Sequence, residues 1–162
     1  MKKLLFFLVF IAVHAFPQTG SLNSSAALLV KAPLSITAIN STLDFGEIIL
    51  TGNPFTPSVP PSRGARFIIQ GTPARNVTVT YNSITLNNNL WVNNYGGKAG
   101  SLVFTPAVRD GSDNQILSGN SYLLSSGAGI GVLNFNIGGS LIIPANQPPG
   151  DYTGQFSFTV SY

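Results

Sequence analysis

The sequence of 162 residues contains no cysteine and only one histidine, one methionine and one tryptophan. Charged residues are also scarce: they make up 8% of the chain, as eight Lys or Arg and five Asp or Glu. Because no disulfide can form, the stability of the fold must come from packing and strand pairing.

The N-terminus has the layout of a secretory signal peptide. Two lysines precede an apolar run from Leu4 to Val13, and small residues follow up to Ala15. The run is too short to span a bilayer comfortably. We therefore expect cleavage after Ala15, which removes the histidine at position 14 and leaves six basic residues against five acidic ones. No basic stripe remains for nucleic acid or an anionic membrane.

The mature chain would hold neither thiol nor imidazole groups. This excludes Cys nucleophiles, Ser-His-Asp triads and metal sites built on thiolates or imidazoles. A pair of carboxylates about 5–10 Å apart in a cleft would suit glycoside hydrolysis, so a hydrolase is one hypothesis. We favour a protein that is not an enzyme and has no cofactor, metal or small-molecule substrate, because it carries so few charges. The five carboxylates are Asp44, Glu47, Asp110, Asp113 and Asp151.

Short apolar runs alternate with segments rich in Gly, Pro, Asn, Asp and Ser. This spacing predicts an all-β sandwich or barrel. No stretch has a sustained period of 3.6 residues, and the Pro and Gly content would break most helices. Segments 51–64 and 82–89 are predicted to be loops. The predicted strands lie within residues 26–39, 43–50, 66–71, 76–81, 90–92, 101–108, 121–124, 131–137, 140–144 and 152–162.

Two local patterns leave alternatives open. Asp110, Asp113 and Asn114 could ligate calcium, but Asp-Gly is also a hairpin signal, and we favour a plain turn. Trp91 and Tyr95 would either pack into the core at a strand end or form an exposed pair that binds a sugar or a protein.

Two stretches carry a family resemblance. In residues 32–48 (APLSITAINSTLDFGEI), an apolar strand leads to a Leu-Asp-Phe-Gly turn. In residues 137–162 (IGGSLIIPANQPPGDYTGQFSFTVSY), a Gly-Gly-x-Leu strand and a Pro-Gly-x-Tyr-x-Gly turn precede an alternating terminal strand. Together they resemble a family of small secreted bacterial domains of unknown function. That family in turn looks like the archaic chaperone–usher pilins of the spore-coat-protein-U type.

The resemblance implies an immunoglobulin-like antiparallel β-sandwich that lacks one strand. In such pilins a periplasmic chaperone lends the missing strand, and the N-terminal extension of another subunit later replaces it by β-strand addition. The protein would be a structural subunit of a secreted surface fibre, a pilus or fimbria. It would pass through the periplasm to the cell surface with the help of a chaperone and an outer-membrane usher. Residues 1–15 would be the signal, 16–32 the donor extension and 33–162 the pilin-like domain.

The resemblance also implies roles for individual residues. The alternating donor strand is Leu22, Ala26, Leu28, Val30 and Ala32. The C-terminal strand that borders the groove and meets the chaperone is Phe156, Phe158, Val160 and Tyr162. The structural motifs are Asp44, Phe45 and Gly46 at a turn, with Tyr152 and Gly154 at the start of the last strand.

The donor residues read equally as the first strand of a complete sandwich. The second hypothesis is therefore a self-complete secreted binding module for a carbohydrate or protein ligand, which would bind through Trp91 and Tyr95.

Overall fold

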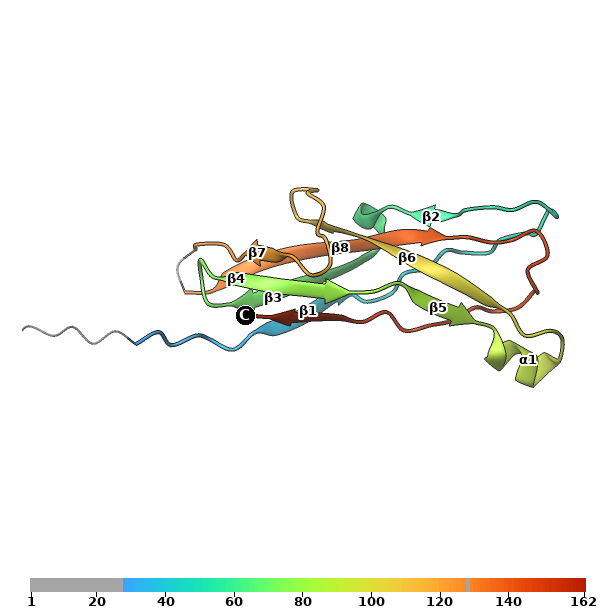
Figure 1. Ribbon diagram of the computed structural model, residues 1–162, viewed down its shortest axis with the longest axis horizontal. Helices are drawn as coiled ribbons and strands as arrows, with labels where there is room; N and C mark the ends of the chain where they lie inside the picture. The colour runs from blue at the N-terminus through green and yellow to red at the C-terminus, as the bar shows by residue number, and fades with distance from the viewer. Residues whose placement is uncertain (1–27, 128) are drawn as a thin grey trace, which may run out of the picture. The chain divides into compact units, whose positions relative to one another are not determined.

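A computed structural model describes residues 28–127 and 129–162 (Figure 1). Contacts divide the chain into two units at Val30. Of the first unit, only residues 28–30 are described, and they have no regular secondary structure. The second unit, Lys31–Tyr162, is described here by itself. Within the described ranges, no helix has the length and apolar composition needed to cross a membrane.

The second unit consists mainly of short strands. In chain order the elements are β1 (Ser35–Asn40), β2 (Ser58–Val59), the 3-10 helix η1 (Pro61–Arg63), β3 (Ala65–Gly71), β4 (Asn76–Tyr81), β5 (Ile84–Asn87), α1 (Asn89–Tyr95), β6 (Ser101–Asp110), β7 (Ser121–Leu123), β8 (Gly131–Leu141) and β9 (Phe158–Ser161).

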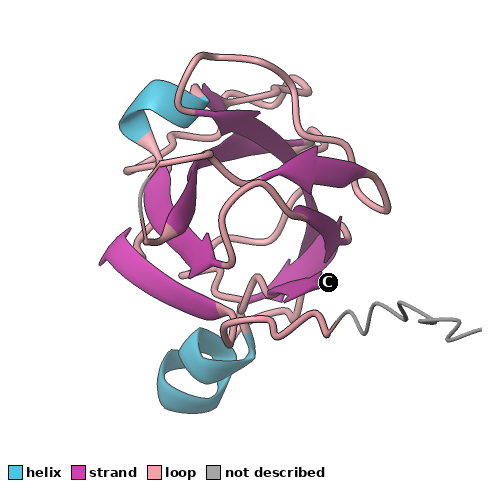
Figure 2. Cartoon of the chain, turned by 90° about the vertical axis from the view of Figure 1, so that its left-hand side faces the viewer, coloured by secondary structure: helices cyan, strands magenta, loops and turns pink. Residues whose placement is uncertain are grey.

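The strands form two antiparallel sheets that curl into a sandwich (Figure 2). The larger sheet has the order β1-β3-β8-β6-β5, and β2 also pairs with β8. The smaller sheet has the order β7-β4-β9. The prediction of an all-β antiparallel sandwich is therefore confirmed. Strands β1, β5, β7 and β9 stand at sheet edges and each pair with one neighbour.

The main core lies between the two sheets. Ile69 of β3, Val77 and Val79 of β4, and Phe135 of β8 are all at most 1% exposed. They come from alternating strand positions, because successive side chains of a strand point to opposite faces. A second apolar cluster, centred on Phe104, lies farther along the larger sheet.

The segment 90–92 was predicted to be a strand and is instead part of helix α1. A seven-residue helix is marginal in isolation, so tertiary contacts must hold it. The fully buried Asn88 precedes the helix, and its side chain bonds to the backbone of Lys98, Gly100 and Pro149. Trp91 packs on Gly150, where an added Cβ would lie 2.8 Å from the indole ring. The local hydrophobic pattern, from which the strand was predicted, carries no information about these contacts.

Other predicted boundaries also differ. Residues 43–50 have no regular structure, and the predicted loop 82–89 contains β5. Strand β8 continues from the predicted strand 131–137 through Gly138 and Gly139 and ends at Leu141, inside the predicted strand 140–144. An added Cβ at Gly138 would lie 2.2 Å from the Val59 carbonyl oxygen, so this glycine lets the crossover at β2 lie against the sheet. The predicted terminal strand 152–162 becomes regular only at β9.

Candidate functional site

An open groove of about 1170 Å³ lies along the larger sheet. One wall is formed by residues 41–50, which follow β1, and the other by residues 147–157, which precede β9. The floor is apolar and comes mainly from β5, β6 and β8: its side chains are Ile84, Leu86, Leu102, Phe104, Ile137 and Leu141. Leu102, Phe104 and Leu141 are at most 6% exposed, because Phe45, Tyr152 and Phe156 of the walls pack on this cluster.

Phe104 links the floor to both walls. Its side chain is 2% exposed. Its ring packs edge-on against Phe45 of the first wall, with centroids 6.0 Å apart, and against Phe156 of the second, with centroids 5.9 Å apart. Edge-to-face packing at this separation is the favoured arrangement of aromatic pairs. The three rings therefore set the spacing of the walls.

Both walls have backbone without strand partners. Among the described residues, no backbone–backbone hydrogen bond involves residues 41–54. In the second wall, Thr153 exchanges two such bonds with Asn87, and residues 154–157 make none within the described chain. Backbone amides and carbonyls normally find partners in a folded protein. The groove therefore has two edges, residues 41–50 and 154–157, whose backbone groups lack backbone partners in the described chain and lie above an apolar floor.

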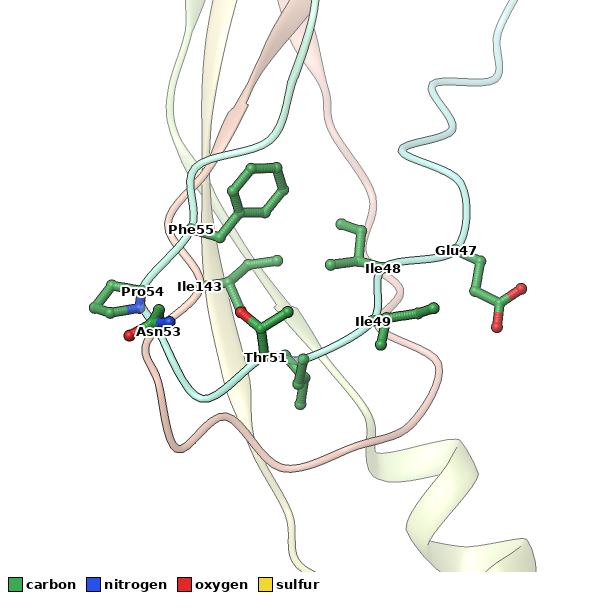
Figure 3. Close-up of a pocket in the computed structure, with 9 residues that line it drawn as sticks. Glu47, Ile48, Ile49, Thr51, Asn53, Pro54, Phe55 and Ile143 are labelled. Atoms are coloured by element: carbon green, nitrogen blue, oxygen red, sulfur yellow. The ribbon is translucent and has the colours of Figure 1, made fainter.

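A smaller pocket of about 490 Å³ adjoins one end of the groove and shares residues 47–50 and Ile143 with it. Figure 3 shows Ile48, Phe55 and Ile143 pointing toward one another, while the Glu47 carboxylate points away. Ile49 is 81% exposed and Phe55 54% exposed. This end of the groove is thus strongly apolar and open.

The charged residues around the groove are all acidic. Asp44, Glu47 and Asp151, three of the five carboxylates in the sequence, line it. No Lys, Arg or His from the described part of the chain does so. Because the structure brings three acids to one groove, the hydrolase hypothesis stays open. The electrostatic character of the groove favours a ligand with positive charge.

The Asp44-Phe45-Gly46 motif builds a turn in the first wall. The Asp44 carboxylate accepts the N–H of Gly46 at 2.8 Å, and Gly46 has a φ of +70°, a conformation that glycine adopts without strain. The turn directs Phe45 onto Phe104. The three residues thus form a turn at the position where the sequence analysis predicted one.

Tyr152 and Gly154 lie in the second wall, ahead of β9 rather than at its start. The Tyr152 hydroxyl accepts a hydrogen bond from Gln147 at 2.6 Å and donates to the Pro148 carbonyl at 2.7 Å. An added Cβ at Gly154 would lie 2.5 Å from Leu86, so glycine lets this wall approach β5.

The four residues predicted to border the groove from the C-terminal strand lie in different surroundings. Phe156 lines the groove. Phe158 and Val160, like Phe156, pack on the main core but do not line the groove, and the Phe158 ring lies 5.1 Å from that of Phe67. Tyr162 lies beyond β9, and its hydroxyl bonds to Thr72. Only the first of the four therefore faces the groove.

The predicted donor residues fall in three groups. Leu22 and Ala26 lie outside the described residues. Leu28 is 89% exposed and Val30 74% exposed, and neither belongs to a strand. Ala32, in the folded unit, is held by hydrogen bonds of both its backbone groups.

Trp91 and Tyr95 come together on α1, one helical turn apart. Their ring centroids are 4.6 Å apart, with an interplanar angle of 44°. Trp91 is half-buried, whereas Tyr95 is 73% exposed. They are thus not at a strand end, and the outer ring is open to solvent.

The acidic loop 110–114 is a turn held by its own hydrogen bonds. The Asp110 carboxylate accepts bonds from the backbone of Ser112 and Asn114 and from the Asn114 amide. Desolvation acts to raise the pKa of Asp110, but these bonds outweigh it and lower that pKa below its ordinary value. Asp113 forms an ion pair with Arg109 at 3.7 Å. Within the described residues, no group of three or more His, Cys, Asp or Glu could hold a metal ion.

A match to a known protein family covers most of the folded unit. Residues 46–162 match a family described as a domain of unknown function, DUF4402. The chain belongs to the DUF4402 family. The matched range begins at Gly46 and includes the second wall and the groove floor. No curated protein matches this chain.

Sequence reasoning missed several residues of this DUF4402 domain that build the site. Leu102 and Phe104 could have been assigned to a buried face, because apolar residues alternate at these positions of β6. The buried Asn88 and Gln147, which brace the end of the second wall, carry no such signal. Asn88 bonds to Pro149 and Gln147 to Ser101, which are 61 and 46 residues away in the sequence.

Proposed function

We propose that the protein is a non-catalytic structural subunit of a secreted surface fibre, and that its groove accepts an extended strand from another subunit. The observation that carries this proposal is the pair of unpaired backbone edges above an apolar floor. An added strand would complete the hydrogen bonding of one or both edges. Its alternate side chains would point into the floor.

The expected energy of strand addition is large compared with the stability of a domain. Burying a large aliphatic side chain contributes roughly 1.5–3 kcal/mol. A strand that fills four or five sites, some only with alanine, would contribute about 5–10 kcal/mol. Total domain stability is about 5–15 kcal/mol. A subunit with an empty groove would therefore be marginal and prone to aggregate through its open edges.

The proposed occupant is the N-terminal extension, residues 16–32. Its residues Leu22, Ala26, Leu28 and Val30 would face the floor of the other subunit, while Ala32 stays bonded to its own domain at the base of the extension. The extension contains no Asp or Glu, and cleavage after Ala15 would give it a positively charged α-amino group at residue 16. This charge complements the acidic lining of the groove. In transit, a periplasmic chaperone would occupy the same groove, and an outer-membrane usher would export the subunits to the cell surface.

The first test is a gel of sheared surface material from the native host, run unheated and after boiling, and probed for this protein. We expect an unheated ladder of multimers that collapses to one band on boiling, because strands held by many backbone hydrogen bonds dissociate slowly. A single monomer band in both lanes would contradict the proposal. It would indicate a complete sandwich and a different function.

A second candidate, a self-complete module that binds glycans, is favoured by the Trp91–Tyr95 pair alone. Tyr95→Ala should weaken glycan binding at least about fivefold, because an aromatic contact is lost. The fluorescence of Trp91 reports binding directly. Leu90→Ala is the matched control on the same helix, since Leu90 is 69% exposed. A Trp91 fluorescence that does not change over a panel of oligosaccharides would remove this candidate.

A further inference from the structure

The C-terminal residue holds the chain just before β1. The Tyr162 hydroxyl donates to the Ala32 carbonyl at 2.7 Å and accepts the Thr72 N–H at 2.7 Å. The Ala32 N–H donates to the Thr72 Oγ1 at 2.6 Å. The Lys31 ammonium lies 4.6 Å from the centre of the Tyr162 ring, a cation–π contact. We name the set Lys31, Ala32, Thr72 and Tyr162 the Tyr162 clasp.

The clasp has a glycine that makes room for it. An added Cβ at Gly71 would lie 2.6 Å from the Tyr162 hydroxyl oxygen and 2.8 Å from the Leu34 side chain. Both backbone groups of Ala32 are bonded, so the chain is held on each side of the residue that precedes Pro33. A residue before proline is also restricted to extended conformations. Residues 31–34 are therefore held in line with β1.

The clasp and the groove lie at opposite ends of the strands that connect them. On β3, Ala65 and Phe67 line the groove at the beginning of the strand, whereas Thr72 follows its end. Strand β1 separates the clasp from the first wall by six residues, roughly 20 Å. The C-terminal segment leaves the groove at Ser157 and reaches the clasp at Tyr162. Figure 1 shows the C-terminus beside the blue segment that leads into β1.

This position limits how far the extension could reach into its own groove. With the chain held straight from Lys31, the tightest fold-back is a hairpin with a two-residue turn at about residues 29–30. Antiparallel pairing would then place residue 16, the first after the predicted cleavage, opposite Leu43, near the start of the first wall. A turn that began at Pro33, a favoured corner residue, would instead place residue 16 opposite Thr51 and cover that whole wall.

From this geometry we infer that the Tyr162 clasp is a positioning device that prevents self-completion and offers residues 16–30 of the extension to a second copy of this chain. The inference rests on the proposed function and adds the partner and the residues that select it. With the clasp closed, the extension covers too little of its own groove to compete with a strand from another copy. With the clasp open, the turn at Pro33 becomes available and a self-completed monomer can form.

The test compares wild type with Tyr162→Phe, which keeps the ring over Lys31 and removes only the hydroxyl. Loss of these hydrogen bonds should raise the monomer share of the unheated gel about tenfold at the expense of the ladder. Exchange of the Ala32 amide proton in the purified mature protein should accelerate about tenfold as well. Thr72→Val, which removes the other side-chain partner, should give the same two shifts. Protected β3 and β8 amides would show that both variants fold.

Tyr122→Phe is the matched control, because it removes a tyrosine hydroxyl that bonds to Leu117 away from the clasp. It should leave the ladder unchanged. A wild-type ladder that Tyr162→Phe and Thr72→Val both leave intact would overturn the clasp and spare the proposed function. The absence of a ladder from wild type itself would overturn both.

Discussion

Phe104→Ala should lower the free energy of unfolding by about 3–5 kcal/mol, the cost of removing a buried phenylalanine. Phe104 is 2% exposed, and its ring contacts Phe45 in one wall and Phe156 in the other. The substitution would leave a cavity where both walls meet the floor. Because a domain's stability is about 5–15 kcal/mol, the loss is a large fraction of the total. Urea unfolding monitored by circular dichroism measures it.

Val103→Ala is the control for this prediction. Val103 immediately precedes Phe104 in β6 and is 52% exposed, since it points to the opposite face. Its truncation should cost about 0.5 kcal/mol or less. Equal losses in the two variants would show that the Phe104 cluster does not hold the groove walls.

The double variant Leu28→Asp/Val30→Asp should fold like wild type and fail to form the ladder. Both side chains are strongly exposed, so the free energy of unfolding should change by no more than about 0.5 kcal/mol. In the proposed fibre, however, both would enter the floor of another subunit. Losing two buried aliphatic side chains costs about 3–6 kcal/mol, and placing carboxylates there costs more. The dissociation rate should rise at least about a hundredfold.

The matched control is Leu117→Asp/Ile130→Asp, which makes the same chemical change at two exposed positions outside the groove. The unheated gel should keep its ladder in this variant. A ladder of wild-type intensity from the Leu28→Asp/Val30→Asp variant would show that residues 28 and 30 are not part of the donated strand.

Patterns that are local in sequence predicted the fold class well. The alternation in β6 and β4 indicated half-buried strands, and the Asp44-Phe45-Gly46 turn has the carboxylate contact and the positive φ that its residue types favour. Such features depend on backbone geometry and near neighbours, which the sequence contains. The alternation at positions 156, 158 and 160 also matches their partial burial, although the regular strand begins only at Phe158.

Other features required contacts between distant segments. The segment 43–50 has the composition of a strand but lacks a partner, so it forms a groove wall instead. Helix α1 forms where a strand was predicted. The hydrogen bond from the buried Asn88 to Pro149 and the packing of Trp91 against Gly150 stabilise it more than the local β propensity favours a strand. Fold-back of the chain supplies these partners, and no window of the sequence contains them.

The sequence by itself determined an all-β chain without thiols and a turn at Gly46, and it predicted a donor strand within residues 16–32. Each follows from composition, periodicity or the conformational preference of single residues. Only the tertiary structure decided that two unpaired edges face one apolar floor, that the acids gather around it, and that Tyr162 holds Ala32. These depend on which segments lie side by side, and packing of the whole domain sets that arrangement.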